Sequence, residues 1–352
     1  MTTYEGTTHA IPAAKRGGRG EAAGRPNWPL LLLLILFPFL LLASFLTGPA
    51  DVPAGDLLSG LFSGQASPAA LIALEIRLPR ALLGALVGAG LGMAGAALQG
   101  YLRNPLAEPS LIGASSSASL GAVLAIYFGL SATAPLALPL AGMLGAGLAM
   151  LLIQGLAGRD ASVLMLILAG LAVQTLAGSL TSLALNLAPN PHAALEIAFW
   201  LLGSLTDRTN DHLLVSAPFI IAGILVLGGS GRALDALGLG ERTAGSMGVD
   251  LNRLRWRIII GTVLSVGAAV AVTGSIGFVG LVVPHLLRRV TGNQPSRLLW
   301  PSALAGACLL LAADILVRLL PTNDELKLGV VTGLIGAPFF FHLLLKTRER
   351  MR

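Results

Sequence analysis

Residues 83–95 read LGALVGAGLGMAG, an apolar run in which Gly84, Gly88 and Gly92 recur every four residues. Residues four apart lie on one face of an α-helix, so these glycines form a strip of small residues along it. In a lipid bilayer such a strip allows a second helix to approach closely. The run therefore predicts a transmembrane helix packed tightly against a neighbour, and we assign the strip a packing role without placing it in a transport path.

The composition of the whole chain agrees with this reading. Of its 352 residues, 55% are hydrophobic and only 11% are charged. These values lie outside the range of soluble globular domains, so we predict an all-α, polytopic membrane protein in a lipid bilayer. The net charge of +6 is attributed to cytoplasmic loops, with no binding of nucleic acid. The single cysteine, Cys308, excludes an intramolecular disulfide and a cysteine-based metal cluster, and we expect it to be a packed core residue.

The apolar runs mark the candidate membrane crossings. Two of them, 194–205 and 276–287, are too short to span a bilayer as ordinary helices. We interpret the first as a partial, periplasmic helix and the second as a short span packed inside the protein, which gives ten transmembrane helices and places both termini in the cytoplasm. The other runs are 28–46, 81–99, 114–130, 133–157, 161–186, 213–230, 258–274, 298–320 and 328–345.

The positive-inside rule supports this topology. Counting both short runs as spans would move the C-terminal tail outside, and exchanging their roles would move the central arginines outside. We predict one transmembrane domain, 28–346, between a disordered cytoplasmic tail, 1–27, and a short cytoplasmic tail, 347–352. Of the 23 lysines and arginines, only these remain outside: Arg77, Arg80, Arg208, Arg318 and Lys327.

A charged, glycine-punctuated segment interrupts the apolar pattern at 231–257, GRALDALGLGERTAGSMGVDLNRLRWR. The topology places it in the cytoplasm, where it is predicted to receive a soluble partner. None of the three lysines lies in a GK[ST] context, so the chain has no phosphate-binding loop of its own and cannot power transport by binding ATP. If transport is active, its energy must come from another subunit. The spans also lack the series of buried Asp, Glu and His expected of a proton- or sodium-coupled carrier.

Charges at the predicted outer ends of two spans are candidate functional residues. Arg77 and Arg80 flank Leu78-Pro79 and break the positive-inside bias, which suggests that they face an acidic partner surface in the periplasm. Asp314 and Arg318 are four residues apart, so they share a helix face and can pair, either for function or merely near the headgroups.

Two further stretches contain helix breaks. Residues 103–110, RNPLAEPS, predict a sharp turn or part of a gate, and we prefer the turn. Residues 273–285, TGSIGFVGLVVPH, predict an interrupted short helix that other parts of the protein cover. We expect His285 to have a capping or packing role. The histidines show no ligand spacing, so we predict no metal site, and no catalytic constellation is apparent in the spans.

Several motifs in the same order together resemble the FecCD-like, type II ABC importer permeases, which import ferric siderophores, haem and vitamin B12. The resemblance covers about residues 28–346. The motifs are Arg77-Leu78-Pro79-Arg80, Leu98-Gln99-Gly100, Asn104-Pro105-Leu106-Ala107-Glu108-Pro109, Ile276-Gly277-Phe278-Val279-Gly280-Leu281 with Pro284-His285, Ala313-Asp314, and Leu334-Ile335-Gly336-Ala337-Pro338-Phe339-Phe340.

This resemblance implies a homodimer in the bacterial inner membrane, with the transport path along the dimer axis. Two cytoplasmic ATPase subunits would bind ATP and Mg, and a periplasmic binding protein would deliver the substrate. The chain itself would be a translocation subunit, not an enzyme, and would bind no cofactor. The implied ATPase-coupling residues are Leu239, Gly240, Glu241, Ala244, Gly248 and Val249, and the implied docking residues for the binding protein are Arg77, Arg80 and Arg318.

The resemblance also assigns the path. The span 161–186 would line it, with Gln174, Thr175, Ser179 and Asn186 as candidates, and 194–205 looks like the gate helix. Two positions depart from the family pattern: Ser275 replaces the usual Pro, and Lys327-Leu328 replaces Pro-Val or Pro-Ile beside the docking face. Siderophore, haem and B12 permeases would share all these features. The alternative function is a secondary carrier or channel independent of an ATPase, which the missing ionisable series disfavours.

Overall fold

The computed structural model describes residues 28–50, 52–62, 67–134, 136–158, 163–321 and 324–350. Every element in these ranges is helical, which confirms the all-α prediction for the described part; the predicted tail 1–27 lies outside it. In chain order the elements are α1 (Trp28–Leu46), α2 (Ala54–Phe62), α3 (Pro68–Leu71), the π-helical turn η1 (Ile72–Arg77), α4 (Leu78–Tyr101), the 3₁₀ turn η2 (Pro109–Ile112), α5 (Ala114–Tyr127), α6 (Leu130–Thr133), α7 (Ala137–Ala157), α8 (Val163–Asn186), α9 (Pro191–Leu201), α10 (Asn210–Gly228), α11 (Gly231–Leu237), α12 (Glu241–Ser246), α13 (Leu251–Thr262), the π-helical turn η3 (Val263–Gly267), α14 (Ala268–Thr273), α15 (Val279–Leu287), α16 (Pro295–Leu319) and α17 (Leu328–Arg350).

Seven helical segments of the described part are long and apolar enough to cross a membrane. Two shorter apolar helices, Ala114–Tyr127 and Leu328–Leu343, accompany them. The number of ten crossings therefore stays a prediction. The seven segments are Trp28–Leu46, Pro68–Tyr101, Ala137–Ala157, Val163–Asn186, Asn210–Gly228, Leu251–Thr273 and Pro295–Leu319.

Helix α4 lies at the centre of the helix packing, and its glycines explain why. A Cβ atom added to Gly88 would lie 2.3 Å from the carbonyl oxygen of Gly306 in α16, and one added to Gly95 would lie 1.9 Å from that of Gly280 in α15. Only glycine permits such close backbone contact. The packing role predicted for 83–95 is confirmed.

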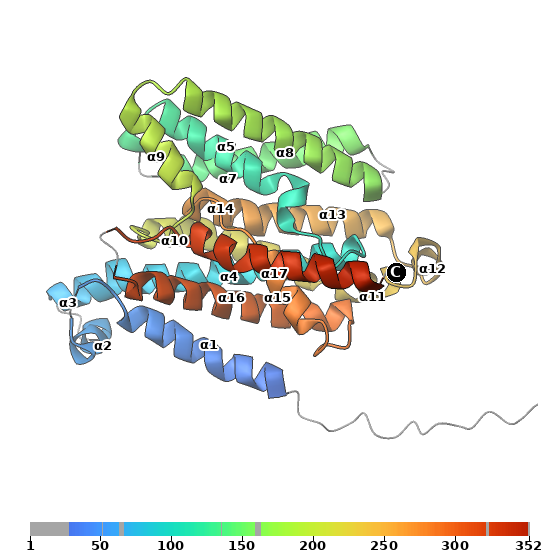
Figure 1. Ribbon diagram of the computed structural model, residues 1–352, viewed down its shortest axis with the longest axis horizontal. Helices are drawn as coiled ribbons and strands as arrows, with labels where there is room; N and C mark the ends of the chain where they lie inside the picture. The colour runs from blue at the N-terminus through green and yellow to red at the C-terminus, as the bar shows by residue number, and fades with distance from the viewer. Residues whose placement is uncertain are drawn as a thin grey trace, which may run out of the picture.

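The remaining helices surround α4 in two groups. Figure 1 shows α5, α7, α8 and α9 gathered on one side, whereas α1 lies against α16 on the other. Helices α2 and α3 lie at one end of the molecule and α11 and α12 at the opposite end, where α1 also begins and α17 ends. We call these the outer end and the cytoplasmic end, after the charge-based prediction.

The structure corrects several predicted boundaries. The outer loop contains α2 and α3, which hydropathy does not reveal because they are short and α2 is largely exposed. Helix α13 begins at Leu251, about two turns before the apolar run that starts at 258. Hydropathy does not reveal these first turns, because they carry exposed Arg253 and Arg257. The Asp250 side chain caps it by accepting from the Arg253 amide at 2.9 Å.

Candidate functional site

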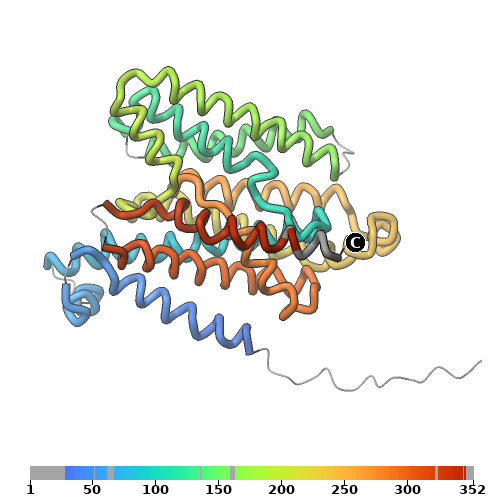
Figure 2. The backbone as a smooth tube through the Cα atoms, viewed as in Figure 1, coloured from blue at the N-terminus to red at the C-terminus, as the bar shows by residue number. Residues whose placement is uncertain are grey.

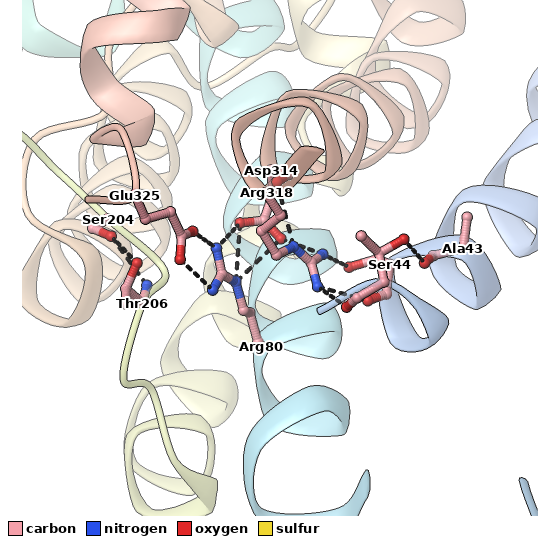
Figure 3. Close-up of polar contacts among 9 residues, drawn as sticks. Ala43, Ser44, Arg80, Ser204, Thr206, Asp314, Arg318 and Glu325 are labelled. Carbon is pink, nitrogen blue, oxygen red and sulfur yellow. Dashed lines mark hydrogen bonds and ion pairs between the residues drawn. The ribbon is translucent and has the colours of Figure 1, made fainter. Parts of the chain in front are cut away.

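The outer end of α4 carries a buried ion-pair network (Figure 3). The Arg80 guanidinium donates to the Asp314 carboxylate in α16, with 2.7 Å between Nη2 and Oδ1, and to both oxygens of Glu325. The Arg80 side chain is 9% exposed and that of Asp314 only 2%. Burying a guanidinium costs free energy unless carboxylates match its charge and donors. Asp314 in α16 and Glu325 in the loop before α17 supply that match.

Arg318 shares the same carboxylate. Its Nη2 lies 2.6 Å from Asp314 Oδ2, which confirms the pair predicted from their spacing. Arg318 also donates to the carbonyl oxygens of Ser44 and Thr47 at 2.8 and 2.6 Å. The last carbonyls of a helix lack partners within it, so a cation there satisfies them and complements the helix dipole. Arg318 thus fastens the end of α1 to α16.

The orientation of these arginines differs from the expectation that Arg77, Arg80 and Arg318 point toward a partner. Their side chains turn into the protein, and Arg77 donates to the backbone carbonyls of Leu46 and Ala50. The structure corrects the outward orientation, because the chain's own carbonyls and carboxylates occupy the donors. Docking of a partner near them stays a prediction.

Glu325 is a site residue that the sequence reasoning missed. The available signal was an acidic side chain just before the last apolar run. Burial alone would raise the pKa of Glu325, but its hydrogen bonds with Arg80 and Thr206 and the charge of Arg80 outweigh burial, so its pKa lies below the ordinary value. Glu325 is therefore ionised at neutral pH and holds Arg80 as a true ion pair.

The segment 325–329 connects this network to α9, and we call it the strap. Two residues after Glu325, the Lys327 ammonium lies 5.7 Å from the centre of the Phe199 ring in α9, within the range of a cation–π contact. The Gly329 amide donates to the Gly203 carbonyl at 3.2 Å. Lys327, one of the positions that depart from the family pattern, therefore contacts the predicted gate helix directly.

Helix α9 (Pro191–Leu201) begins three residues before the predicted gate segment 194–205 and ends four residues before that segment ends. Asn190 caps its start by accepting from the Ala193 amide at 2.8 Å, and Gly203, with φ of +72°, turns the chain after its end. A cavity of about 550 Å³ lies beside it at the outer end. Its lining includes charged residues of both signs, namely Glu196, Asp207, Arg208 and Lys327, together with His192 and Trp200.

The four predicted path residues all lie on α8. Thr175, Ser179 and Asn186 share one exposed face, whereas Gln174 lies to its side and is half-buried. Ser182 falls on the same face. Toward the cytoplasmic end this face continues with exposed leucines, Leu164, Leu168 and Leu171. The face is thus polar in its outer half and apolar in its inner half, and its role as a path stays a prediction.

At the cytoplasmic end, the loop between α10 and α13 projects beyond the other helix ends (Figure 2). Gly240 and Gly248, with φ of +107° and +80°, bound the short helix α12. Leu239 is 65% exposed, and the exposed Glu241 lies 3.6 Å from Arg103. The surface of this loop is therefore open to a partner.

The structure corrects the prediction that Ala244 lies on the coupling surface. Its side chain is fully buried, because its carbonyl oxygen accepts from the amides of Met247 and Val249 and folds the loop around it. It supports the loop from inside. The α11 helix is anchored in turn by Asp235, whose carboxylate accepts from the Ser296 amide and the Gln294 side chain, both at 2.8 Å.

The two helix-break motifs meet beside α4. The Glu108 carboxylate accepts from the Phe278 amide at 2.9 Å at the start of α15, and Gln99 of α4 accepts from Arg288 at 2.7 Å. The sharp turn preferred for 103–110 is confirmed, and it covers the short helix as expected. His285 packs its ring 5.7 Å from that of Phe339, which confirms a packing role. In the described ranges, no three His, Cys, Asp or Glu side chains gather as a metal site would require.

Comparison with known proteins gives consistent matches over most of the chain. Residues 33–346 match the FecCD transport family. The chain is 41% identical to the vitamin B12 import system permease protein BtuC of Vibrio cholerae, over 84% of this chain and 89% of that protein. It is 36% identical to the hemin transport system permease protein HmuU of Yersinia pestis (90% and 97%) and 36% identical to the Fe(3+) dicitrate transport system permease protein FecD of Escherichia coli (90% and 99%). A solved inward-facing structure assigned to the metal-chelate type of ABC transporter matches with a TM-score of 0.80 and 32% identity, over 91% of this chain and all of that chain.

Proposed function

This chain belongs to the FecCD transport family, and from that membership we propose that it is the membrane permease of an ATP-binding cassette importer. Its substrate would be an iron–siderophore complex, haem or a corrinoid, carried from the periplasm to the cytoplasm. Relatives named for vitamin B12, hemin and ferric dicitrate are 41%, 36% and 36% identical, so similarity does not separate these substrates.

The observation that best supports an ATPase-driven mechanism is the exposed α12 loop. Leu239, Glu241 and Gly248 present side chain and backbone to solvent at the cytoplasmic end, while Asp235 ties the loop's base to α16. A partner that moves α12 would therefore move the helices joined to it. We propose that two ATPase subunits, which bind ATP and Mg, dock here on a homodimer of this chain.

At the outer end, we propose that a periplasmic binding protein docks near the arginines, and that α9 gates the path along α8. Because Glu325 occupies Arg80 in the free chain, a partner carboxylate has to exchange with Glu325 to reach that guanidinium. Alternating access then follows when docking and ATP binding act on the two ends in turn. The proposal places the chain in the bacterial inner membrane with both termini in the cytoplasm.

Reconstitution tests the proposal. Proteoliposomes containing this chain, its ATPase and its binding protein should take up labelled cobalamin, haem or a ferric siderophore only when ATP is present on the ATPase side. Liposomes with the chain alone are the control. Uptake at the same rate without the ATPase would instead support the alternative, a secondary carrier or channel.

A further inference from the structure

The end of α9 is held where three chain segments cross, and each segment contributes a glycine. A Cβ atom added to Gly274, directly after α14, would collide with the carbonyl oxygen of Trp200 in α9. One added to Gly203 or to Gly329 would collide with the carbonyl oxygen of Ser275. Backbones approach this closely only where no side chain separates them. We call these three glycines and the backbone that they contact the glycine joint.

Hydrogen bonds fasten the same joint. The Ser204 amide donates to the Thr273 carbonyl at 2.7 Å, and the Gly329 amide donates to the Gly203 carbonyl at 3.2 Å. Gly203 and Thr273 are buried, so water does not compete for these bonds. The end of α9 is therefore fixed through its backbone to the end of α14 and the start of α17.

The start of α9 is held more loosely. Residues 189–192 are exposed, and the Asn190 side chain accepts from an amide of the helix that it caps. Ile197 packs against α5 and α8 in a small apolar cluster, the kind of contact in which packed helices can slide. The contact with α6 is an exposed hydrogen bond from Ser131 to Glu196, 3.5 Å long. The two ends of α9 thus differ in how firmly they are attached.

The glycine joint also ends the helical segment that begins at the α12 loop. From Leu251, which follows the capping residue Asp250, to Thr273 the chain is continuously helical over 23 residues. A helix of this length rises about 34 Å, enough to cross a bilayer. A displacement of the α12 loop therefore reaches the end of α9 through one helix.

We propose that the glycine joint positions the gate. Helix α9 turns about its C-terminal end, with Gly203, Gly274 and Gly329 as the pivot, and its start swings across α5. The inference rests on the proposed gating role of α9 and adds which end of the helix moves. The backbone contacts of the joint supply a fixed point, and the exposed residues 189–192 supply a free end next to the polar face of α8.

Cross-linking of paired cysteines tests the pivot. In a Cys308→Ala background, Ser131→Cys with Glu196→Cys allows α9 to be fastened to α6, and Phe199→Cys with Lys327→Cys allows its end to be fastened to the strap. A short bifunctional thiol reagent joins each pair in proteoliposomes that also contain the ATPase and the binding protein. Linking the first pair stops the swing and should lower ATP-dependent uptake about tenfold, whereas linking the second should leave uptake within about twofold of the same variant unlinked.

Uptake is measured with the labelled cobalamin, haem or ferric siderophore that wild type transports. Inhibition by the second link, or normal uptake after the first, would overturn the pivot. Uptake before linking reports on the proposed function separately. If wild type and both unlinked variants show no ATP-dependent uptake, the importer itself is contradicted, and the pivot with it.

A pair of glycine variants tests the joint itself. Gly274 and Gly129 have similar φ angles of +72° and +69°, but a Cβ at Gly129 would meet nothing within 4 Å. Gly274→Ala should therefore raise hydrogen exchange at residues 201–204 and lower uptake per ATP hydrolysed about tenfold, whereas Gly129→Ala should change neither. Equal effects of the two variants would show that the φ angle alone is responsible and would contradict the joint. If Gly274→Ala does not fold, the two cross-links decide the question.

Discussion

At the outer end of the molecule, Arg80 and Arg318 share the almost fully buried carboxylate of Asp314 at 2.7 and 2.6 Å. At the cytoplasmic end, Arg103 and Glu241 lie 3.6 Å apart with side chains 46% and 51% exposed. The sequence marks both regions alike, as charges at the end of a span. Their energetics differ, because removing one partner of a buried pair strands a charge, whereas an exposed pair is solvated whether or not it forms.

This difference in burial indicates different roles for the charged residues at the two ends. The outer network joins α1, α4, α16 and the strap, so its first effect is to hold elements together. The α12 loop makes few such ties through its charged groups, so Glu241 is available for a partner. Four variants test the contrast.

Asp314→Ala should have the largest effect on stability. It leaves Arg80 and Arg318 without their shared carboxylate, and breaking a buried pair costs about 3–5 kcal/mol. Unfolding of the purified chain in detergent, followed by circular dichroism against temperature, measures the loss. A melting curve equal to that of wild type would show that the network does not stabilise the fold.

Glu325→Gln should destabilise the chain by roughly 1–2 kcal/mol at pH 7, the value of charged hydrogen bonds to Arg80. Because the folded-state pKa of Glu325 is lowered, this contribution is present above its ordinary pKa of 4.5 and is lost as pH falls through the lower folded value. The stability difference between wild type and variant should therefore vanish in acid.

The same variant tests the proposed exchange at Arg80. Glutamine holds the guanidinium less strongly, so the binding protein should bind Glu325→Gln more tightly than wild type in nanodiscs at pH 7. Weaker binding would mean that Glu325 belongs to the docking surface itself.

Lys327→Met should cost about 0.5–1 kcal/mol, since it removes the cation over Phe199 but keeps a side chain of similar length. Hydrogen exchange at the end of α9 should increase as the strap loosens. Arg208→Met, also beside the outer cavity, is the matched control. Equal hydrogen exchange in Lys327→Met and wild type would show that the Lys327 side chain does not help the strap to hold α9.

Glu241→Ala should change stability least, by less than about 0.5 kcal/mol, because its pair with Arg103 is exposed. Coupling should nonetheless suffer, and ATP-dependent uptake in proteoliposomes should fall while the variant melts like wild type. Normal uptake together with normal binding-protein-stimulated ATPase activity would contradict a coupling role for this residue.

Sequence reasoning predicted what depends on local spacing. The glycine strip of 83–95 and the pair of Asp314 and Arg318 each follow from helix periodicity. It missed the contact of Arg80 with Asp314, 234 residues away, because such contacts arise only from packing. It also placed Ala244 on the coupling surface. A loop that is exposed throughout and a loop folded around one small buried residue have similar sequences, so the burial of Ala244 could not be predicted.

The close contacts of α4 also restrict how the protein can move. Sliding α4 against α16 or α15 would drive one backbone into another, because Gly88 faces Gly306 and Gly95 faces Gly280 with no side chain between. These three helices therefore form a rigid frame. Any rearrangement during a transport cycle has to be accommodated elsewhere, among elements such as the outer half of α8, where Gly178 has open space around it.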